Sequence, residues 1–226
     1  MTKEDSRLLF ERGLQFLGRQ TASQSHEVTN VLNIINEMAG LMGDLLYSAG
    51  QGRPLDPDRL TQLTTKIAAQ VKRGNQIVRA INQFGHSADK PLAVFDVQAV
   101  LERITFIAQR PASLHETLLE TDFPEQTVAL ENSPLGFQQA VFTAFEIALA
   151  AATDKRRITI GYRLVSEGLL LTVHSDDPLI DHEDVAEKAK FLRLLVATLG
   201  GQVITLLDDD APHRIELLFP KQTGEG

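Results

Sequence analysis

The chain has 226 residues, of which 43% are hydrophobic and 23% are charged, a composition typical of a folded globular protein. Its formal net charge is −8, and its longest basic run is only the three residues 155–157. Nucleic acid is therefore excluded as the expected partner, because binding to phosphates requires clustered cations. Cysteine is absent, which excludes disulfides, thiolate metal sites and a cysteine nucleophile and fits a reducing compartment.

Neither a signal peptide nor a membrane span is predicted. The first six residues are polar and acidic, and the most apolar stretch, 140–152, is short and interrupted by Glu146. A membrane-spanning helix needs about 20 apolar residues. We therefore expect a cytoplasmic protein without a membrane partner.

The N-terminal part of the chain reads as helix. Residues 7–49 contain no proline, and the apolar residues recur at intervals of three and four, a pattern typical of a helix in a bundle. The series is Val28, Leu32, Ile35, Met38, Met42 and Leu45. Two glycines and two prolines in 48–58 end this helix, and a second amphipathic helix is expected over 59–84. A hairpin alone leaves its apolar stripe half covered, so we expect a homodimer that completes a four-helix bundle.

The C-terminal part mixes helices with β-strands. Helices are expected over 95–109, 133–153 and 182–199, and strands over 117–123, 126–131, 157–165, 168–175, 203–207 and 214–219. This order indicates helices layered on one face of a mixed sheet. The predicted fold class is α followed by α+β, with a helical-hairpin domain over 1–90 and a helix/sheet sandwich over 91–226.

A polar face runs along the first helix, opposite its apolar stripe. Steps of three, four and seven residues collect His26, Asn30, Asn33, Glu37, Gly40 and Asp44 on that face. His26 is therefore expected to be exposed in mid-helix, with Glu27 beside it and Asn30 one turn further on. An isolated exposed histidine is usually a surface residue without a role, so the neighbouring residues must decide.

This arrangement suits phosphoryl transfer. The reaction needs an accessible imidazole with one unprotonated nitrogen, and Glu27 could fix the tautomer by accepting a hydrogen bond from the other nitrogen. Asn30 could position a phosphate or a water without adding charge. Gly40 keeps the surface low where a partner could approach. A zinc-binding H-E-x-x-H motif is excluded because its second histidine is missing, and no serine-hydrolase signature is present.

The stretch SHEVTNVLNIIN at 25–36 resembles the H-box of two-component sensor histidine kinases. Residues 137–151 resemble the ATP-domain helix of that family, and ELLFP at 216–220 resembles its last strand. The resemblance implies that His26 is the phospho-acceptor, with Glu27 as its orienting acid and Asn30 as a polar assistant. It also implies a response-regulator receiver domain as the partner, which supplies its own aspartate and Mg²⁺. The partner would contact Asn33, Glu37, Gly40 and Asp44.

The nucleotide site of that family is not retained. Thr143 and Ile147 stand where its asparagines are expected, and Ser175 replaces the adenine-reading aspartate. Asp177 and Leu179 stand in place of the two glycines that let the backbone approach the nucleotide. We therefore expect no ATP and no other cofactor or metal on this chain. In type it is closest to stand-alone histidine phosphotransferases with a vestigial nucleotide domain.

Alternative functions remain open from the sequence. They are a divergent ATP-dependent histidine kinase, a dimeric scaffold that only binds a receiver domain, and a phosphatase in which Asn30 orients a water. Among the other histidines, His86 is expected in a solvated loop and His174 half-buried with a hydrogen bond. No pair of histidines has metal-ligand spacing.

Overall fold

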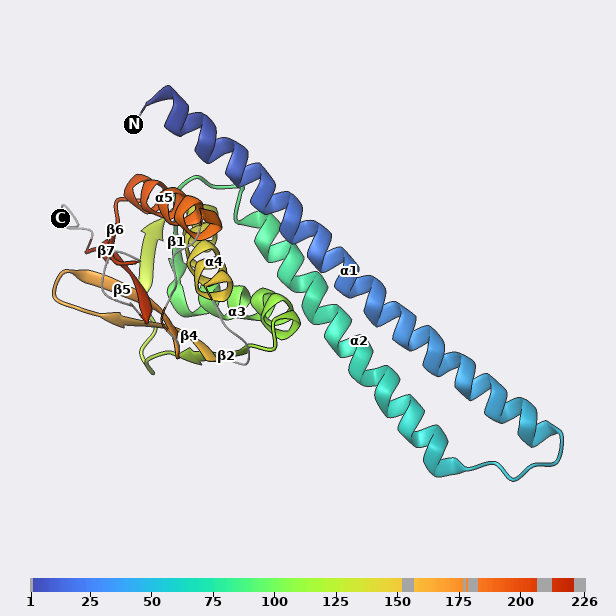
Figure 1. Ribbon diagram of the computed structural model, residues 1–226. Coiled ribbons are helices and arrows are strands. Elements are labelled where there is room, and N and C mark those ends of the chain that lie inside the picture. Colours follow the sequence, from blue (N-terminus) through green and yellow to red (C-terminus); the bar gives the residue numbers. More distant parts are fainter. Residues whose placement is uncertain (1, 152–156, 177, 179–182, 207–212, 222–226) are drawn as a thin grey trace. The chain divides into compact units, whose positions relative to one another are not determined.

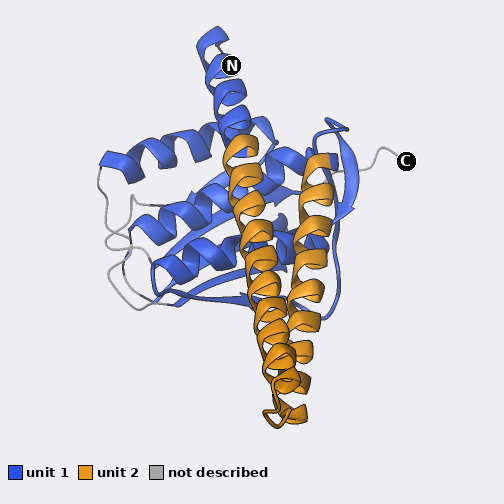
Figure 2. Ribbon diagram, turned by 90° about the vertical axis from the view of Figure 1, so that its right-hand side faces the viewer, with its two compact units in different colours: residues 1–16, 86–226 blue, residues 17–85 orange. Residues whose placement is uncertain are grey.

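A computed structural model describes residues 2–151, 157–176, 178, 183–206 and 213–221. The chain forms two compact units (Figure 2). Unit 2 comprises residues 17–85, and unit 1 comprises residues 1–16 together with 86–226. The predicted boundary between residues 90 and 91 differs from this division mainly because residues 1–16 belong to unit 1.

Two long helices, α1 (Lys3–Gly50) and α2 (Pro57–His86), make the hairpin (Figure 1). Helix α2 begins at Pro57 because Asp56 caps it: Asp56 Oδ1 accepts hydrogen bonds from the backbone N–H groups of Asp58 and Arg59 at 3.0 and 3.1 Å. The helical N-terminal region is thus confirmed, with ends that extend a few residues beyond the prediction. The dimeric bundle stays a prediction.

The hairpin buries one set of apolar side chains and leaves another exposed. Val31 from α1 and Leu63 and Ile77 from α2 are buried. Leu32 is 58% exposed and Val71 is 47% exposed, and Leu46 and Val78, which lie two and one heptads further along the same stripes, are exposed as well. A single hairpin therefore covers only part of its apolar surface.

Unit 1 is built on a five-stranded sheet with the order β2-β4-β5-β7-β6. Its strands are β2 (Leu118–Asp122), β4 (Arg157–Leu164), β5 (Gly168–Ser175), β6 (Gln202–Thr205) and β7 (Arg214–Pro220). The pairing of β2 with β4 is parallel and the other pairings are antiparallel. The helices α3 (Val97–Leu114), α4 (Pro134–Ala150) and α5 (Glu183–Thr198) cover one face of this sheet (Figure 1). The predicted fold class is therefore confirmed for the helix and mixed-sheet part.

A second, two-stranded sheet corrects one prediction. Residues 93–96 form strand β1 (Ala93–Asp96), which pairs with β3 (Ala129–Asn132) so that Phe95 lies opposite Leu130. A helix starting at Phe95 was wrong, because Asp96 is the N-cap of α3 and accepts a hydrogen bond from the N–H of Ala99 at 2.9 Å. The helix also continues past Pro111 to Leu114.

Helix α4 forms the centre of unit 1. Ser133 caps it and Pro134 is its first residue, as the sequence predicted. Most of its residues are buried, which is typical of a helix that is apolar all round. Phe137 contacts Phe95 and Phe219 with ring centroids 5.3 and 5.2 Å apart.

The first turns of α1 pack on unit 1. The ring of Phe16, which is buried, lies 5.6 Å from that of Phe142 on α4. Arg12 forms an ion pair with Glu187 on α5. These contacts explain why residues 1–16 belong to unit 1 although they continue into the hairpin helix. None of the helices in the described part of the chain has the apolar length needed to cross a lipid bilayer.

Candidate functional site

The polar face predicted for α1 is exposed along its whole length. His26 lies in the middle of the 48-residue helix, far from either end, and its side chain faces solvent. The other members of the face, Asn30, Asn33, Glu37, Gly40 and Asp44, are exposed as well. A continuous helix holds the spacing between these residues fixed, so an approaching partner meets His26 and the rest of the face together.

Glu27 lies differently from what the sequence suggested. Its side chain is only 11% exposed and turns toward α2, where Arg73 Nη2 donates a hydrogen bond to Glu27 Oε2 at 2.6 Å. The acid next to His26 is therefore an anchor between the two helices. Sequence reasoning missed Arg73, because the pairing joins residues 46 positions apart. The only available signal was a basic residue on the flank of the second apolar stripe.

A groove between the two helices lies beside this ion pair. It has a volume of about 360 Å³ and is lined by Glu27, Asn30, Val31, Asn33, Ile34 and Arg73. The helices approach closely at Gly74, where a Cβ atom would lie 3.2 Å from Val31 Cγ1. Asn30 and Asn33 thus share a groove with Arg73, whose side chain is 54% exposed. Two amides and a guanidinium can donate hydrogen bonds to an anion there.

In unit 1, three of the positions expected to contact a nucleotide are packed inside the protein. The Ile147 side chain is fully buried at 0% exposure, and Thr143 and Ser175 are buried as well. Ser175 Oγ has no hydrogen-bond partner within the described part of the chain. Asp177 and Leu179 lie outside the described residues. Thr143 and Ile147 of α4 therefore belong to the core of the unit.

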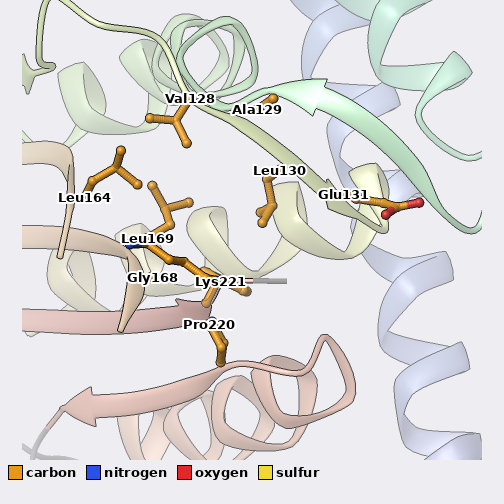
Figure 3. A pocket seen from close by; sticks show the side chains of 10 residues that line it. Val128, Ala129, Leu130, Glu131, Leu164, Gly168, Leu169, Pro220 and Lys221 are labelled. Atoms are coloured by element: carbon orange, nitrogen blue, oxygen red, sulfur yellow. The ribbon is translucent and has the colours of Figure 1, made fainter. Parts of the chain in front are cut away.

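Unit 1 has a separate, mostly apolar hollow of about 270 Å³ (Figure 3). It lies between β3 and the adjoining ends of β5 and β7, and its lining includes Leu130, Leu164, Leu169 and Phe219. Glu131 and Lys221 are the charged residues of its lining. This hollow contains no histidine and no pair of carboxylates that could perform acid–base chemistry.

The other histidines that the structure describes do not form a second site. His86 is the last residue of α2, and its Nδ1 lies 2.8 Å from Asp89 Oδ2 on an exposed surface. His174 is exposed, so the expectation that it is half-buried was wrong; its ring lies 6.4 Å from that of His213. Within the residues that the structure describes, no three acidic or histidine side chains are grouped as metal ligands.

No family model matches the sequence, and no curated protein is similar to it. Solved structures do match. The catalytic domain of histidine kinase ThkA aligns with a TM-score of 0.50 at 11% identity, covering 58% of this chain and 98% of that domain. The chain has a histidine kinase-like fold.

Two further structures are similar at lower TM-scores. Histidine kinase ThkA in complex with response regulator protein TrrA aligns with 97% of this chain and 66% of that chain, at 16% identity and a TM-score of 0.49. Histidine kinase AdeS of Acinetobacter baumannii aligns with 85% of this chain and 94% of that chain, at 15% identity and a TM-score of 0.45. At these identities the likeness concerns the fold, and the chemistry has to be argued from the residues of the site.

Proposed function

We propose that this chain is a histidine phosphotransferase of two-component signalling, which carries a phosphoryl group on His26 to or from an aspartate of a response-regulator receiver domain. The observation that carries the proposal is the exposed His26 in the middle of a helical hairpin, followed by Asn30 beside the groove. The histidine kinase-like fold supports the same class of chemistry.

The transfer step needs only groups that the two partners provide. The unprotonated nitrogen of neutral His26 attacks the phosphorus of an aspartyl phosphate, the phosphorus–oxygen bond to the aspartate breaks, and the carboxylate leaves with the electron pair. The imidazole then carries a positive charge on its phosphorylated ring, and the proton stays on the other nitrogen. The reverse reaction returns the phosphoryl group. Mg²⁺, which neutralises charge on the transferring group, belongs to the receiver domain in this proposal.

Glu27 and Asn30 have supporting roles in the proposal. A carboxylate has about four lone-pair sites, so Glu27 can hold Arg73 and still offer an oxygen to a ring N–H. The Arg73 pair holds this carboxylate against α2, one residue along the chain from His26, instead of leaving it free in solvent. Asn30, exposed one turn from His26, can donate its amide N–H to the phosphoryl oxygens.

We further propose that the chain transfers phosphoryl groups without ATP. The residues that replace the nucleotide contacts support this, because Ile147 is fully buried and has no polar atom in its side chain to bind phosphate or Mg²⁺. The exposed Leu32, Leu46, Val71 and Val78 support a homodimer, because a second hairpin would cover them. Sedimentation equilibrium of wild type and of Leu32→Glu measures this directly; a wild-type monomer at micromolar concentration contradicts the dimer.

The deciding experiment follows radiolabelled phosphate. The protein is incubated with Mg²⁺ and either γ-labelled ATP or, without ATP, a receiver domain that already carries the radiolabelled phosphate, and His26→Ala is compared with wild type. His115→Ala is the matched control, because His115 is exposed and lies in unit 1, outside the hairpin.

We expect label on wild type and on His115→Ala only through the receiver, and none on His26→Ala. Label taken directly from ATP would make the protein a divergent kinase. Loss of label from the receiver without appearance of phosphohistidine would favour a phosphatase in which Asn30 orients water. Binding without any movement of label would leave only a scaffold.

A further inference from the structure

Two rows of charged and polar side chains run along the His26 side of the hairpin. The row on α1 consists of Asn30, Glu37 and Asp44, each seven residues from the next. The row on α2 consists of Arg73, Lys66 and Arg59, again seven residues apart. All six residues are exposed, and a spacing of seven residues corresponds to about two helical turns, which keeps each row on one side of its helix.

The two rows meet at the groove through Asn30 of α1 and Arg73 of α2. Asn30 and Arg73 both line it, and the Glu27–Arg73 pair fixes the level at which the antiparallel helices meet. A step of seven residues up α1 corresponds to a step of seven residues down α2. Glu37 is therefore within about one helical turn of the level of Lys66, and Asp44 within about one turn of the level of Arg59.

Most charged residues of the two rows form no ion pair within the hairpin. In unit 2, all of which is described, Arg73 pairs with Glu27, but no ion pair joins Glu37 to Lys66 or Asp44 to Arg59. Helix α2 carries five cationic residues, and Asp58 is its only acidic one. In a chain with a net charge of −8 this basic helix is a local exception. The two rows thus have opposite signs, acidic on α1 and basic on α2.

We propose that these rows orient the partner on His26, by binding an acidic surface over α2 and a basic surface over α1. The inference rests on the proposed function, because it takes the partner to be a receiver domain. A site that binds Mg²⁺ through carboxylates has an acidic rim, which fits the Arg59–Lys66–Arg73 row. Opposite rows fix a direction of approach as well as an affinity, since a partner turned around meets charges of its own sign.

The test is a charge swap that keeps the net charge constant. Glu37→Lys with Lys66→Glu reverses the two rows at one level, whereas Lys66→Glu alone changes only one row. Lys72→Glu is the matched control: it makes the same charge change at an exposed position on α2, but steps of seven from Lys72 lead to Arg79 and Thr65, outside the row. Thermal unfolding followed by circular dichroism checks that every variant folds.

The probes are the purified receiver domains of the same organism, loaded with Mg²⁺ and phosphorylated with acetyl phosphate. We expect the double swap to lower kcat/KM for phosphotransfer by about tenfold or more. The difference in transfer rate from wild type should become smaller as the receiver concentration approaches saturation. Lys66→Glu alone should lose less than the double swap, and Lys72→Glu should change kcat/KM by less than about twofold. Higher salt should narrow the difference between wild type and the double swap.

A double swap that transfers as well as wild type would overturn the inference. It would mean that the sign of the charge on each helix does not matter and that only the net charge does. Equal losses for Lys72→Glu and Lys66→Glu would overturn it as well. Binding of the same receivers, measured by fluorescence anisotropy, separates this inference from the proposed function. Receivers that bind wild type more tightly than the double swap but never label His26 would support the rows and contradict the phosphotransferase.

Discussion

The His26 side of α1 and the helix α4 differ in how far their side chains are exposed to solvent. Both stretches resemble functional elements of histidine kinases, one carrying the phospho-acceptor and the other the nucleotide contacts. On α1 the polar residues stay polar and exposed, and Asn30, Asn33 and Arg73 gather at a groove. On α4 the corresponding positions, Thr143 and Ile147, are buried. The two stretches thus differ in burial within one chain, and the proposed function takes the first as a retained site and the second as core.

The difference shows where sequence constraints come from in each region. The residues around His26 contribute little to burial, so packing does not require a histidine and an asparagine there. The apolar residues of α4 are held by packing, and Phe137, for example, sits between Phe95 and Phe219. Substitutions in the first region should therefore affect activity, and substitutions in the second should affect stability.

Removal of the imidazole should have the largest effect. We expect His26→Ala to lose phosphotransfer by about a thousandfold or more, because no other side chain on the polar face offers a nucleophilic nitrogen of the same kind. The free energy of unfolding should change by less than about 0.5 kcal/mol, as is usual for exposed positions. Rapid-quench measurement of label transfer and urea denaturation give the two values. A stable variant that still transfers label would remove His26 from the mechanism.

Restoring an asparagine on α4 tests the other side of the comparison. Ile147→Asn should lower the free energy of unfolding by about 3–5 kcal/mol, because it removes a fully buried apolar side chain and buries an amide. Ile204→Asn, on an exposed position of β6, should cost less than about 1 kcal/mol. Urea denaturation measures both variants. A well-folded Ile147→Asn that binds a fluorescent ATP analogue would show that the α4 surface is still open to nucleotide.

Removal of the Glu27–Arg73 ion pair between α1 and α2 should have an intermediate effect on stability. Arg73→Ala leaves the largely buried carboxylate of Glu27 without its guanidinium, and we expect a loss of about 1–3 kcal/mol in stability. Lys72→Ala, at the preceding and likewise exposed residue, is the control and should stay within about 0.5 kcal/mol of wild type. The double variant Arg73→Ala with Glu27→Gln should recover part of the loss, which a double-mutant cycle in urea measures. No recovery would mean that Arg73 stabilises the hairpin mainly through its apolar stem.

Substitution of two glycines by alanine should have the smallest effects on the free energy of unfolding, and it tests how closely the two helices pack. Gly43→Ala should raise the free energy of unfolding by about 0.5–1 kcal/mol, because a Cβ there meets no other atom within 4 Å. Gly74→Ala should gain less, because its Cβ would lie 3.2 Å from Val31 Cγ1 beside the groove. Thermal melts of the two variants provide the comparison. Equal gains would mean that the helices can separate slightly at the groove without cost.

Local patterns predicted most of the secondary structure. The period of the apolar residues gave the two hairpin helices, and Ser133 with Pro134 marked the start of α4. The exposed polar face around His26 followed from the same period. Strand β1 was missed because its partner, β3, lies more than 30 residues away, so Phe95 owes its conformation to pairing with Leu130.

The candidate site was predicted only in part, for a related reason. Glu27 was placed beside His26 on the basis of its neighbour in the chain, whereas its position is set by Arg73, which arrives from the other helix. The groove and the two charged rows likewise need both helices. Periodicity in one helix shows which residues share a face, but it contains no information about the level at which a second helix lies against it.

The contact between Phe16 and Phe142 of α4 has a consequence for folding during synthesis. Phe16 leaves the ribosome 126 residues (142 − 16) before Phe142, the residue against which its ring packs. The hairpin of unit 2 can assemble from contiguous residues during synthesis, but in unit 1 the first turns of α1 must wait for α4 and α5. Until then Phe16 has no cover from α4 and is available to chaperones. A fragment starting at residue 86 would emerge with Phe142 permanently uncovered.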